Sequence, residues 1–227
     1  MSTSLRPICF GLLRRRTCLL PTWRGWLALL FSAVAVIAVL VCGLFPFLAM
    51  NDPKPGGALI VEGWMPDYAF TDAIAEFHRA PYSAMLVTGG PIEKGAPFSE
   101  FRTFAEFGAA TVVKLGLATA QVHAVPAPEV PQDRTYASAV AVREWLQQHG
   151  GVPAQINVMS LGAHSRRTRL LYEAAFTGVT EVGIIAIDDH SYNGRRWWAS
   201  SQGVRIVIDE LLAYAYARLL FRKPREF

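Results

Sequence analysis

The sequence predicts an α/β protein: a three-layer, Rossmann-like domain with a mainly parallel five-stranded sheet, preceded by one N-terminal transmembrane helix. Two observations carry this prediction. Five short apolar runs, typical of buried strands, alternate with segments of helical periodicity. Ahead of them stands an apolar run of 25 residues that contains no charge.

The uncharged run covers residues 26–50 and predicts the transmembrane helix. A helix of this length extends roughly 37 Å, whereas the hydrocarbon core of a bilayer is about 30 Å thick. Backbone amides in lipid must be paired within the segment, so a helix is the form that fits. Trp23 and Trp26 lie where interfacial aromatic residues are expected.

Charge sets the expected orientation of this helix. No acidic residue occurs before Asp52, and arginines precede the apolar run. The arginines are Arg6, Arg14, Arg15, Arg16 and Arg24. The positive-inside rule then keeps residues 1–25 in the cytoplasm and exports the domain. We therefore expect a single-pass protein with an extracytoplasmic domain.

A cleaved signal peptide is the alternative reading of the same segment. Its apolar region is usually about 7–15 residues long and ends at an A-x-A-like site. Here the run is longer, and Leu48-Ala49-Met50 fits a cleavage site poorly. Cys42 follows Val41 rather than the small residue that a lipoprotein site prefers. We therefore expect an uncleaved anchor.

Composition limits what the exported domain can be. Residues 51–227 contain 17 basic and 18 acidic side chains, so charge gives no reason to expect nucleic-acid binding. The cysteines, Cys9, Cys18 and Cys42, all precede the domain, which excludes a disulfide framework, a thiol nucleophile and a cysteine-ligated metal within it. Residues 51–57 read as a short Pro/Gly linker, and residues 58–227 as one domain.

Strands and helices alternate along this domain. The expected strands are 58–63, 84–90, 122–125, 156–161 and 182–187. The expected helices follow Asp67 and Ser99 as N-caps, and then cover 133–149, 166–176 and 206–221. Continuous apolar strands separated by helices indicate a parallel sheet covered on both faces. We expect the last helix to pack as part of a layer; the alternative is that its tyrosines and basic end rest on anionic lipid.

Ligands of such sheets bind beyond the carboxyl ends of the strands. Polar residues and glycines therefore become the candidate site residues where they follow a strand. They are Glu62 and Gly63, then Thr88, Gly89, Gly90 and Glu100, then Asp133, Arg134 and Thr135, and finally His164 and Arg167.

The order of these motifs resembles the SanA/YdcF/ElyC-type family of bacterial envelope proteins. The matching elements are Thr88-Gly89-Gly90, Glu100, Asp133-x-Thr135-Tyr136 and His164-x-x-Arg167. The likeness covers about residues 58–187. It implies a bacterial inner-membrane protein with a role in cell-envelope or peptidoglycan-related processes, without defining a reaction. The sequence departs from the family pattern at two places. Glu62-Gly63-Trp64 stands where the family has a glycine-rich turn, and Ala137-Ser138-Ala139 stands where it often has an asparagine. These departures suggest a ligand different from that of better-known members.

Each candidate has a chemical role and a plainer alternative. Arg167 can clamp a phosphate or carboxylate, and His164 can serve as a general acid, a base or a donor. Asp133 can act as a base, and Glu100 as a catalytic carboxylate at a helix start. The plainer readings are that Glu100, Asp133 and His164 cap helices and that the arginines form a solvated face.

Other site types receive less support. A hard-metal site would combine Asp188, Asp189 and His190 with Glu62 and His164, but only their placement in the fold suggests it, and we predict no metal. The P-loop, dinucleotide-binding and nucleophile-elbow motifs do not occur in the sequence, and no cofactor is identified. The sequence thus predicts either a domain that binds or processes a small anionic, phosphorylated or lipid-linked ligand, or a non-catalytic regulator of envelope assembly.

Overall fold

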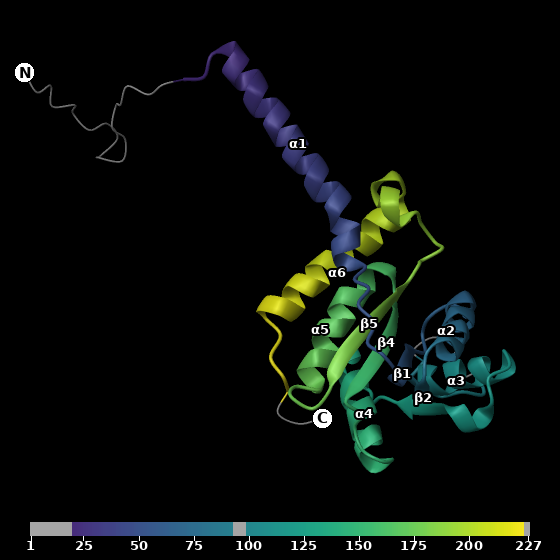
Figure 1. Cartoon of the computed structure of the whole chain (residues 1–227). Coiled ribbons are helices and arrows are strands. Elements are labelled where there is room, and N and C mark those ends of the chain that lie inside the picture. Colours follow the sequence, from purple (N-terminus) through teal and green to yellow (C-terminus); the bar gives the residue numbers. More distant parts are fainter. Residues whose placement is uncertain (1–19, 93–98, 225–227) are drawn as a thin grey trace, which may run out of the picture. The chain divides into compact units, whose positions relative to one another are not determined.

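A computed structural model describes residues 20–92 and 99–224 (Figure 1). Its centre is one sheet of five parallel strands in the order β3-β2-β1-β4-β5. The strands are β1 (Gly57–Glu62), β2 (Tyr82–Gly89), β3 (Val122–Pro126), β4 (Gln155–Leu161) and β5 (Glu181–Ile187). The predicted α/β class with five parallel strands is confirmed.

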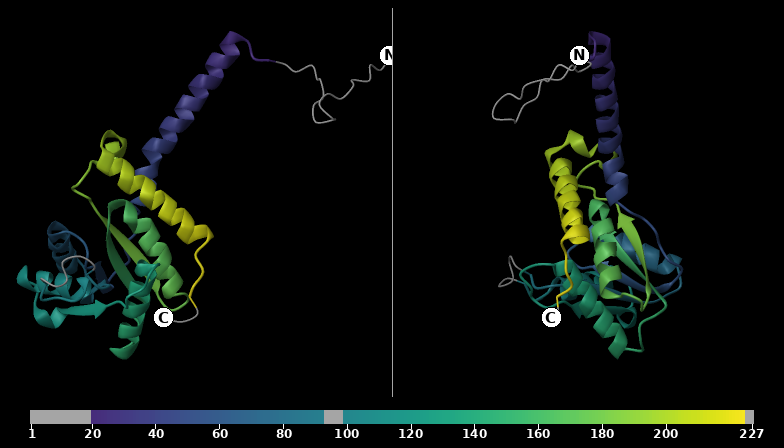
Figure 2. Two further views of the ribbon diagram at one scale, coloured as in Figure 1. Left: turned by 180° about the vertical axis from the view of Figure 1, so that it is seen from behind. Right: turned by 90° about the vertical axis from the view of Figure 1, so that its left-hand side faces the viewer.

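Helices cover both faces of the sheet, as continuous apolar strands require. The helices of the domain are α2 (Asp67–Arg79), α3 (Phe104–Lys114), α4 (Arg134–Gln148), α5 (Ser165–Ala175) and α6 (Ser201–Leu219). Neighbouring residues of β1 divide between two cores: Ile60 packs with residues of α4 and α5, and Val61 packs with residues of α2 and α3. Helix α6 lies along α5 on the side away from the sheet (Figure 2).

Three helices begin at positions that differ from the prediction. Helix α2 has Pro66 at its N-cap, so Asp67 is its first residue and does not cap it. Helix α3 begins at Phe104 rather than near Ser99. Helix α6 begins at Ser201, where the Ser200 hydroxyl accepts a hydrogen bond from a backbone amide. A short 3-10 helix, η4 (Gly194–Ala199), precedes it and was not predicted.

The N-terminal helix α1 (Trp23–Leu48) is 26 residues long. It is long and apolar enough to cross a membrane, and its properties fit a membrane anchor or a signal sequence. The chain divides into two compact units, one up to Val41 and one from Cys42 to the C-terminus. The final turn of α1 therefore belongs to the domain, where Leu48 is fully buried.

Residues 51–57, which connect α1 to β1, are held against the sheet. Asp52 exchanges two backbone hydrogen bonds with Ile184 and so extends the outer edge of β5. The buried side chain of Asn157 accepts a hydrogen bond from Lys54 N and donates to the carbonyl oxygens of Lys54 and Gly56. The connecting segment is thus a fixed part of the fold, although its composition reads as a linker.

Candidate active site

A cavity of about 1070 Å³ opens at the carboxyl ends of the central strands. It is bordered by the ends of β1 and β2, the loop of residues 127–132 after β3, the start of α4 and the start of α5. The predicted site residues that line it are Glu62, Thr88, Gly89, Gly90, Asp133, Arg134, Thr135, His164 and Arg167. Most of the predicted site therefore converges on one place, as expected for a parallel sheet.

Glu62 forms the floor of this cavity at the end of β1. The residue is only 4% exposed, and its Oε2 accepts a hydrogen bond of 2.5 Å from Ser160 Oγ. Its other oxygen, Oε1, lies 3.6 Å from Nε2 of His164. A buried carboxylate persists only with such partners. Glu62 is therefore fixed by strand β4 and by His164.

His164 is held between two carboxylates. Nε2 faces Glu62, and Nδ1 lies 2.8 Å from Oε1 of Glu210 on α6. Burial alone would lower the pKa of His164, but the charges and hydrogen bonds of Glu62 and Glu210 outweigh it and raise the pKa to about 9. His164 is thus an imidazolium at neutral pH. Its side chain does not cap α5, contrary to the plainer reading.

Glu210 also orients Arg167. The guanidinium donates from Nε to Oε2 at 2.9 Å and from Nη2 to Oε1 at 3.1 Å. Burial would raise the pKa of Glu210, but hydrogen bonds from His164 and Arg167 lower it to about 2. Among the described residues, Nη1 of Arg167 has no hydrogen-bond partner. This bidentate pair leaves two N–H groups of a fixed guanidinium free beside the cavity.

Arg167 and His164 are also neighbours. Nη2 of Arg167 lies 2.8 Å from Nδ1 of His164. Because Nδ1 of an imidazolium is itself a donor, these two cations cannot bond each other, and both donate to Oε1 of Glu210 instead. Glu210 is therefore the common counter-ion of the pair.

Asp133 occupies the N-cap position of α4 in an unusual way. Its backbone has the left-handed φ of 57°, and its side chain makes no capping hydrogen bond. Burial raises its pKa, an effect that the charge of Arg167 partly offsets. The described residues offer its carboxylate no hydrogen bond or ion pair. Asp133 and the backbone amide of Thr135, in a first turn of α4 that the Asp133 side chain does not cap, thus lie at the cavity.

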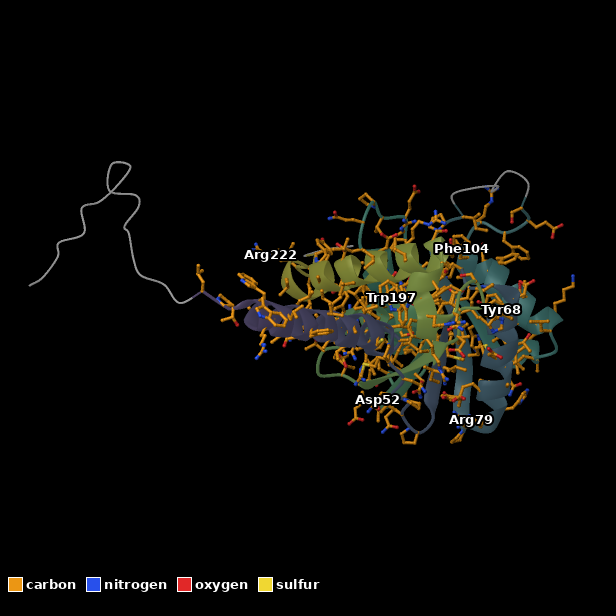
Figure 3. The ribbon with its side chains drawn as sticks, turned by 90° about the horizontal axis from the view of Figure 1, so that it is seen from above. Asp52, Tyr68, Arg79, Phe104, Trp197 and Arg222 are labelled. Carbon is orange, nitrogen blue, oxygen red and sulfur yellow. The ribbon has the colours of Figure 1, made fainter. Side chains whose placement is uncertain are left out.

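The Thr88-Gly89-Gly90 motif has a mainly structural role. The buried Thr88 hydroxyl donates to the Val125 carbonyl oxygen at 2.9 Å and so joins β2 to β3. A Cβ at Gly89 would lie 2.8 Å from the Cβ of Phe104, which is labelled in Figure 3. Neither Gly89 nor Gly90 has a positive φ. Gly89 is required by the close approach of α3.

Two predicted residues lie outside the lining of the cavity. Gly63 follows β1, where a Cβ would come within 2.2 Å of the Phe104 carbonyl oxygen. Glu100 is exposed and precedes α3 by four residues. A capping box closes the start of α3: the Thr103 hydroxyl accepts a hydrogen bond from Glu106 N, and the Glu106 carboxylate accepts one from Thr103 N. The prediction that Glu100 opens this helix is wrong.

Other members of the site were not predicted. Glu210 lies within the mostly apolar helix α6, three residues after Val207 and seven before Ala217. Because both of these residues are buried, this spacing places Glu210 on the inner face of α6. The ring of Trp64 lies edge-on to His164 at 5.3 Å and also lines the cavity. The loop of residues 127–132 adds apolar walls through its prolines.

The side chains of the alternative metal site do not lie together. His190 stacks on Tyr68, and a carboxylate oxygen of Asp189 accepts a hydrogen bond from the amide of Ser191. Within residues 20–92 and 99–224, no three His, Cys, Asp or Glu side chains form a group that could hold a metal ion. Glu62 and His164 instead belong to the buried ion-pair network.

No family model, curated protein or solved structure matches this chain.

Proposed function

We propose that this protein is a membrane-anchored domain that binds a small anionic ligand in the cell envelope. In a catalytic form of this proposal, the domain also processes that ligand. One observation carries the proposal. Arg167 is fixed by Glu210, and its Nη1 group has no partner among the described residues, at a cavity that also borders the start of α4. A guanidinium fork beside a helix N-terminus that its N-cap side chain leaves open is a suitable receptor for a phosphate or carboxylate.

The size and walls of the cavity favour a ligand larger than an inorganic ion. About 1070 Å³ is at the upper end of small-molecule sites, which measure roughly 300–1,000 Å³. Trp64, Pro128, Val130 and Pro131 supply apolar surface on its border. A phosphate carried by a larger, partly apolar group, such as an isoprenoid, suits this combination.

Asp133 is the best candidate for a general base in a catalytic version of this proposal. Its carboxylate has no partner among the described residues, and its raised pKa makes it a better base than an ordinary aspartate. His164 is unsuited to that role, because it is already protonated at neutral pH. It would supply positive charge or a hydrogen bond at the base of the site.

A non-catalytic binding domain is the second candidate. The observation that favours it is the pairing of His164 with both Glu62 and Glu210, which engages both ring nitrogens of the one histidine among the described lining residues. The motif order that resembles the SanA/YdcF/ElyC-type family supports an envelope role for either candidate. The arginines before α1 support a cytoplasmic N-terminus and a domain outside the inner membrane.

Thermal unfolding of the full-length protein in detergent tests the ligand class. The probes are an isoprenyl monophosphate, the corresponding isoprenol and sodium phosphate, with sodium chloride at equal ionic strength. We expect the phosphorylated lipid to raise the melting temperature and the alcohol to leave it unchanged, because only the former engages Arg167. Equal shifts with both lipids, or none, would contradict the proposal.

A pair of variants assigns the effect to the site. Arg167→Lys keeps a positive charge for Glu210 but removes the free Nη1 group, so the shift should disappear. Arg166→Lys, one residue earlier and outside the cavity, should retain it. Circular dichroism of both variants checks that each is folded.

A further inference from the structure

Helix α6 presents a row of apolar side chains to solvent. Val204, Ile208, Leu212 and Leu219 are 39%, 37%, 63% and 78% exposed. Their spacing of four or seven residues places them on one face of the helix. The opposite face packs inward through Val207 and Ala217. The packing of the described domain therefore uses one apolar face of α6 and leaves the other uncovered.

The segment that carries this row is also the basic part of the domain. Residues 194–227 contain seven basic and three acidic side chains, whereas residues 51–193 contain ten basic and 15 acidic ones. Arg205 and Arg218 lie within α6, and Arg222 follows its end, labelled in Figure 3. One of the three acids, Glu210, points inward to Arg167. An apolar face flanked by cations is typical of a helix that binds anionic lipid.

The final turn of α1 is in contact with α6 within the domain. The ring centroids of Phe47 and Tyr214 lie 5.6 Å apart, and the Arg166 guanidinium stacks 4.0 Å above the Phe47 ring. The uncharged run ends at Met50, shortly after these contacts. If α1 spans the bilayer, α6 is held where the chain leaves the hydrocarbon.

We propose that the α6 surface, defined as Val204, Ile208, Leu212 and Leu219 with the flanking arginines, rests on the anionic surface of the membrane that holds α1. Apolar residues then enter the headgroup region while Arg205, Arg218 and Arg222 contact lipid phosphates. The inference rests on the proposed membrane anchor and not on the ligand of the cavity. A second copy of the chain and another protein are the occupants that the test must exclude.

Lipid quenching of site-specific probes in the full-length protein tests this. Cys9, Cys18 and Cys42 are first replaced by serine, and a polarity-sensitive fluorophore is attached at Leu212→Cys. The protein is reconstituted in vesicles of phosphatidylglycerol and phosphatidylcholine that contain nitroxide-labelled lipid. Leu115→Cys is the matched control, an exposed leucine at the end of α3 on the other side of the sheet. Val34→Cys in the middle of α1 reports the anchor itself.

We expect several-fold stronger lipid quenching at Leu212 than at Leu115, and protection of the Leu212 probe from aqueous iodide. Strong quenching at Val34 with equal, weak quenching at Leu212 and Leu115 would overturn the α6 inference and retain the anchor. Weak quenching at Val34 would overturn both. Iodide protection at Leu212 without lipid quenching would mean that a second copy or another protein covers α6, which also contradicts the inference.

Discussion

Glu210 on α6 lies 2.8 Å from Nδ1 of His164 at the start of α5, although 46 residues separate them in the chain. The same carboxylate accepts two hydrogen bonds from Arg167. This single acid therefore joins the outer helix to residues beyond the carboxyl end of β4 and compensates two cations.

Glu210→Gln should destabilise the domain by about 3 kcal/mol, because removal of one partner leaves buried charge uncompensated. Asp209→Asn is the control, since Asp209 is the exposed neighbour on the same helix and such changes usually stay within about 0.5 kcal/mol. Urea unfolding of both variants in detergent gives the difference. Equal stabilities would show that the network contributes nothing to folding.

The free energy of unfolding should decrease in alkaline solution because His164 loses its proton. The pKa of His164 in the folded protein is raised to about 9 from an ordinary value of 6.5. The stabilisation by protonated His164 is therefore complete below pH 6.5 and is lost as the pH rises through about 9. Glu210, with its pKa lowered to about 2, contributes fully above its ordinary 4.5 and loses this as pH falls through 2. The alkaline loss is on the order of 3 kcal/mol.

Urea unfolding between pH 6.5 and 9.5 measures this loss. His164→Gln should flatten the alkaline limb of the profile, and His149→Gln, an exposed histidine at the end of α4, should leave it unchanged. If the stability of His164→Gln decreased with pH as steeply as that of the parent, the pH dependence would belong to another group.

The backbone of Asp133 predicts which substitutions its position accepts. A φ of 57° is tolerated by Asn but costs other L-residues roughly 1–2 kcal/mol. Its raised pKa also means that ionised Asp133 costs stability at neutral pH. Asp133→Asn should therefore be as stable as the parent or slightly more so, and Asp133→Ala less stable by about 1 kcal/mol. Thermal unfolding at pH 7 would refute this if the order were reversed.

The start of α3 provides a comparison between two glutamates. Glu106→Ala removes the carboxylate that accepts from the amides of Arg102 and Thr103 and should cost about 1 kcal/mol. Glu100→Ala should change neither stability nor the melting shift with the phosphorylated lipid, because Glu100 is exposed and outside the lining of the cavity. A lost shift in Glu100→Ala would restore its predicted role in the site.

Local sequence patterns predicted most of the fold and part of the site. The five apolar runs predicted the strands of the parallel sheet. Ligands of such sheets bind beyond the carboxyl ends of the strands, and this rule predicted four residues that line one cavity: Glu62, Asp133, His164 and Arg167. The predicted start of α3 near Ser99 is wrong, although Thr103-x-x-Glu106 has the spacing of a capping box. Ser99, which precedes it, is an equally good N-cap by composition.

The charge state of the site could not be predicted in the same way. It depends on Glu210, which reaches His164 only because α6 packs over α5. Likewise, nothing local indicates that Asn157, buried in β4, bonds the backbone of Lys54. Contacts between residues so far apart in the chain arise from tertiary packing, and a single sequence contains no periodic signal for them.

The attachment of Asp52 to Ile184 has a consequence for solubility. Together with the Asn157 hydrogen bonds, it holds this segment against the outer edge of β5, the edge that faces no other strand of the sheet. A fragment cut at Gly57 would lose this cover and expose backbone groups that invite pairing between chains. The short segment after the anchor thus protects the sheet from self-association, and the domain's natural boundary lies before Asp52.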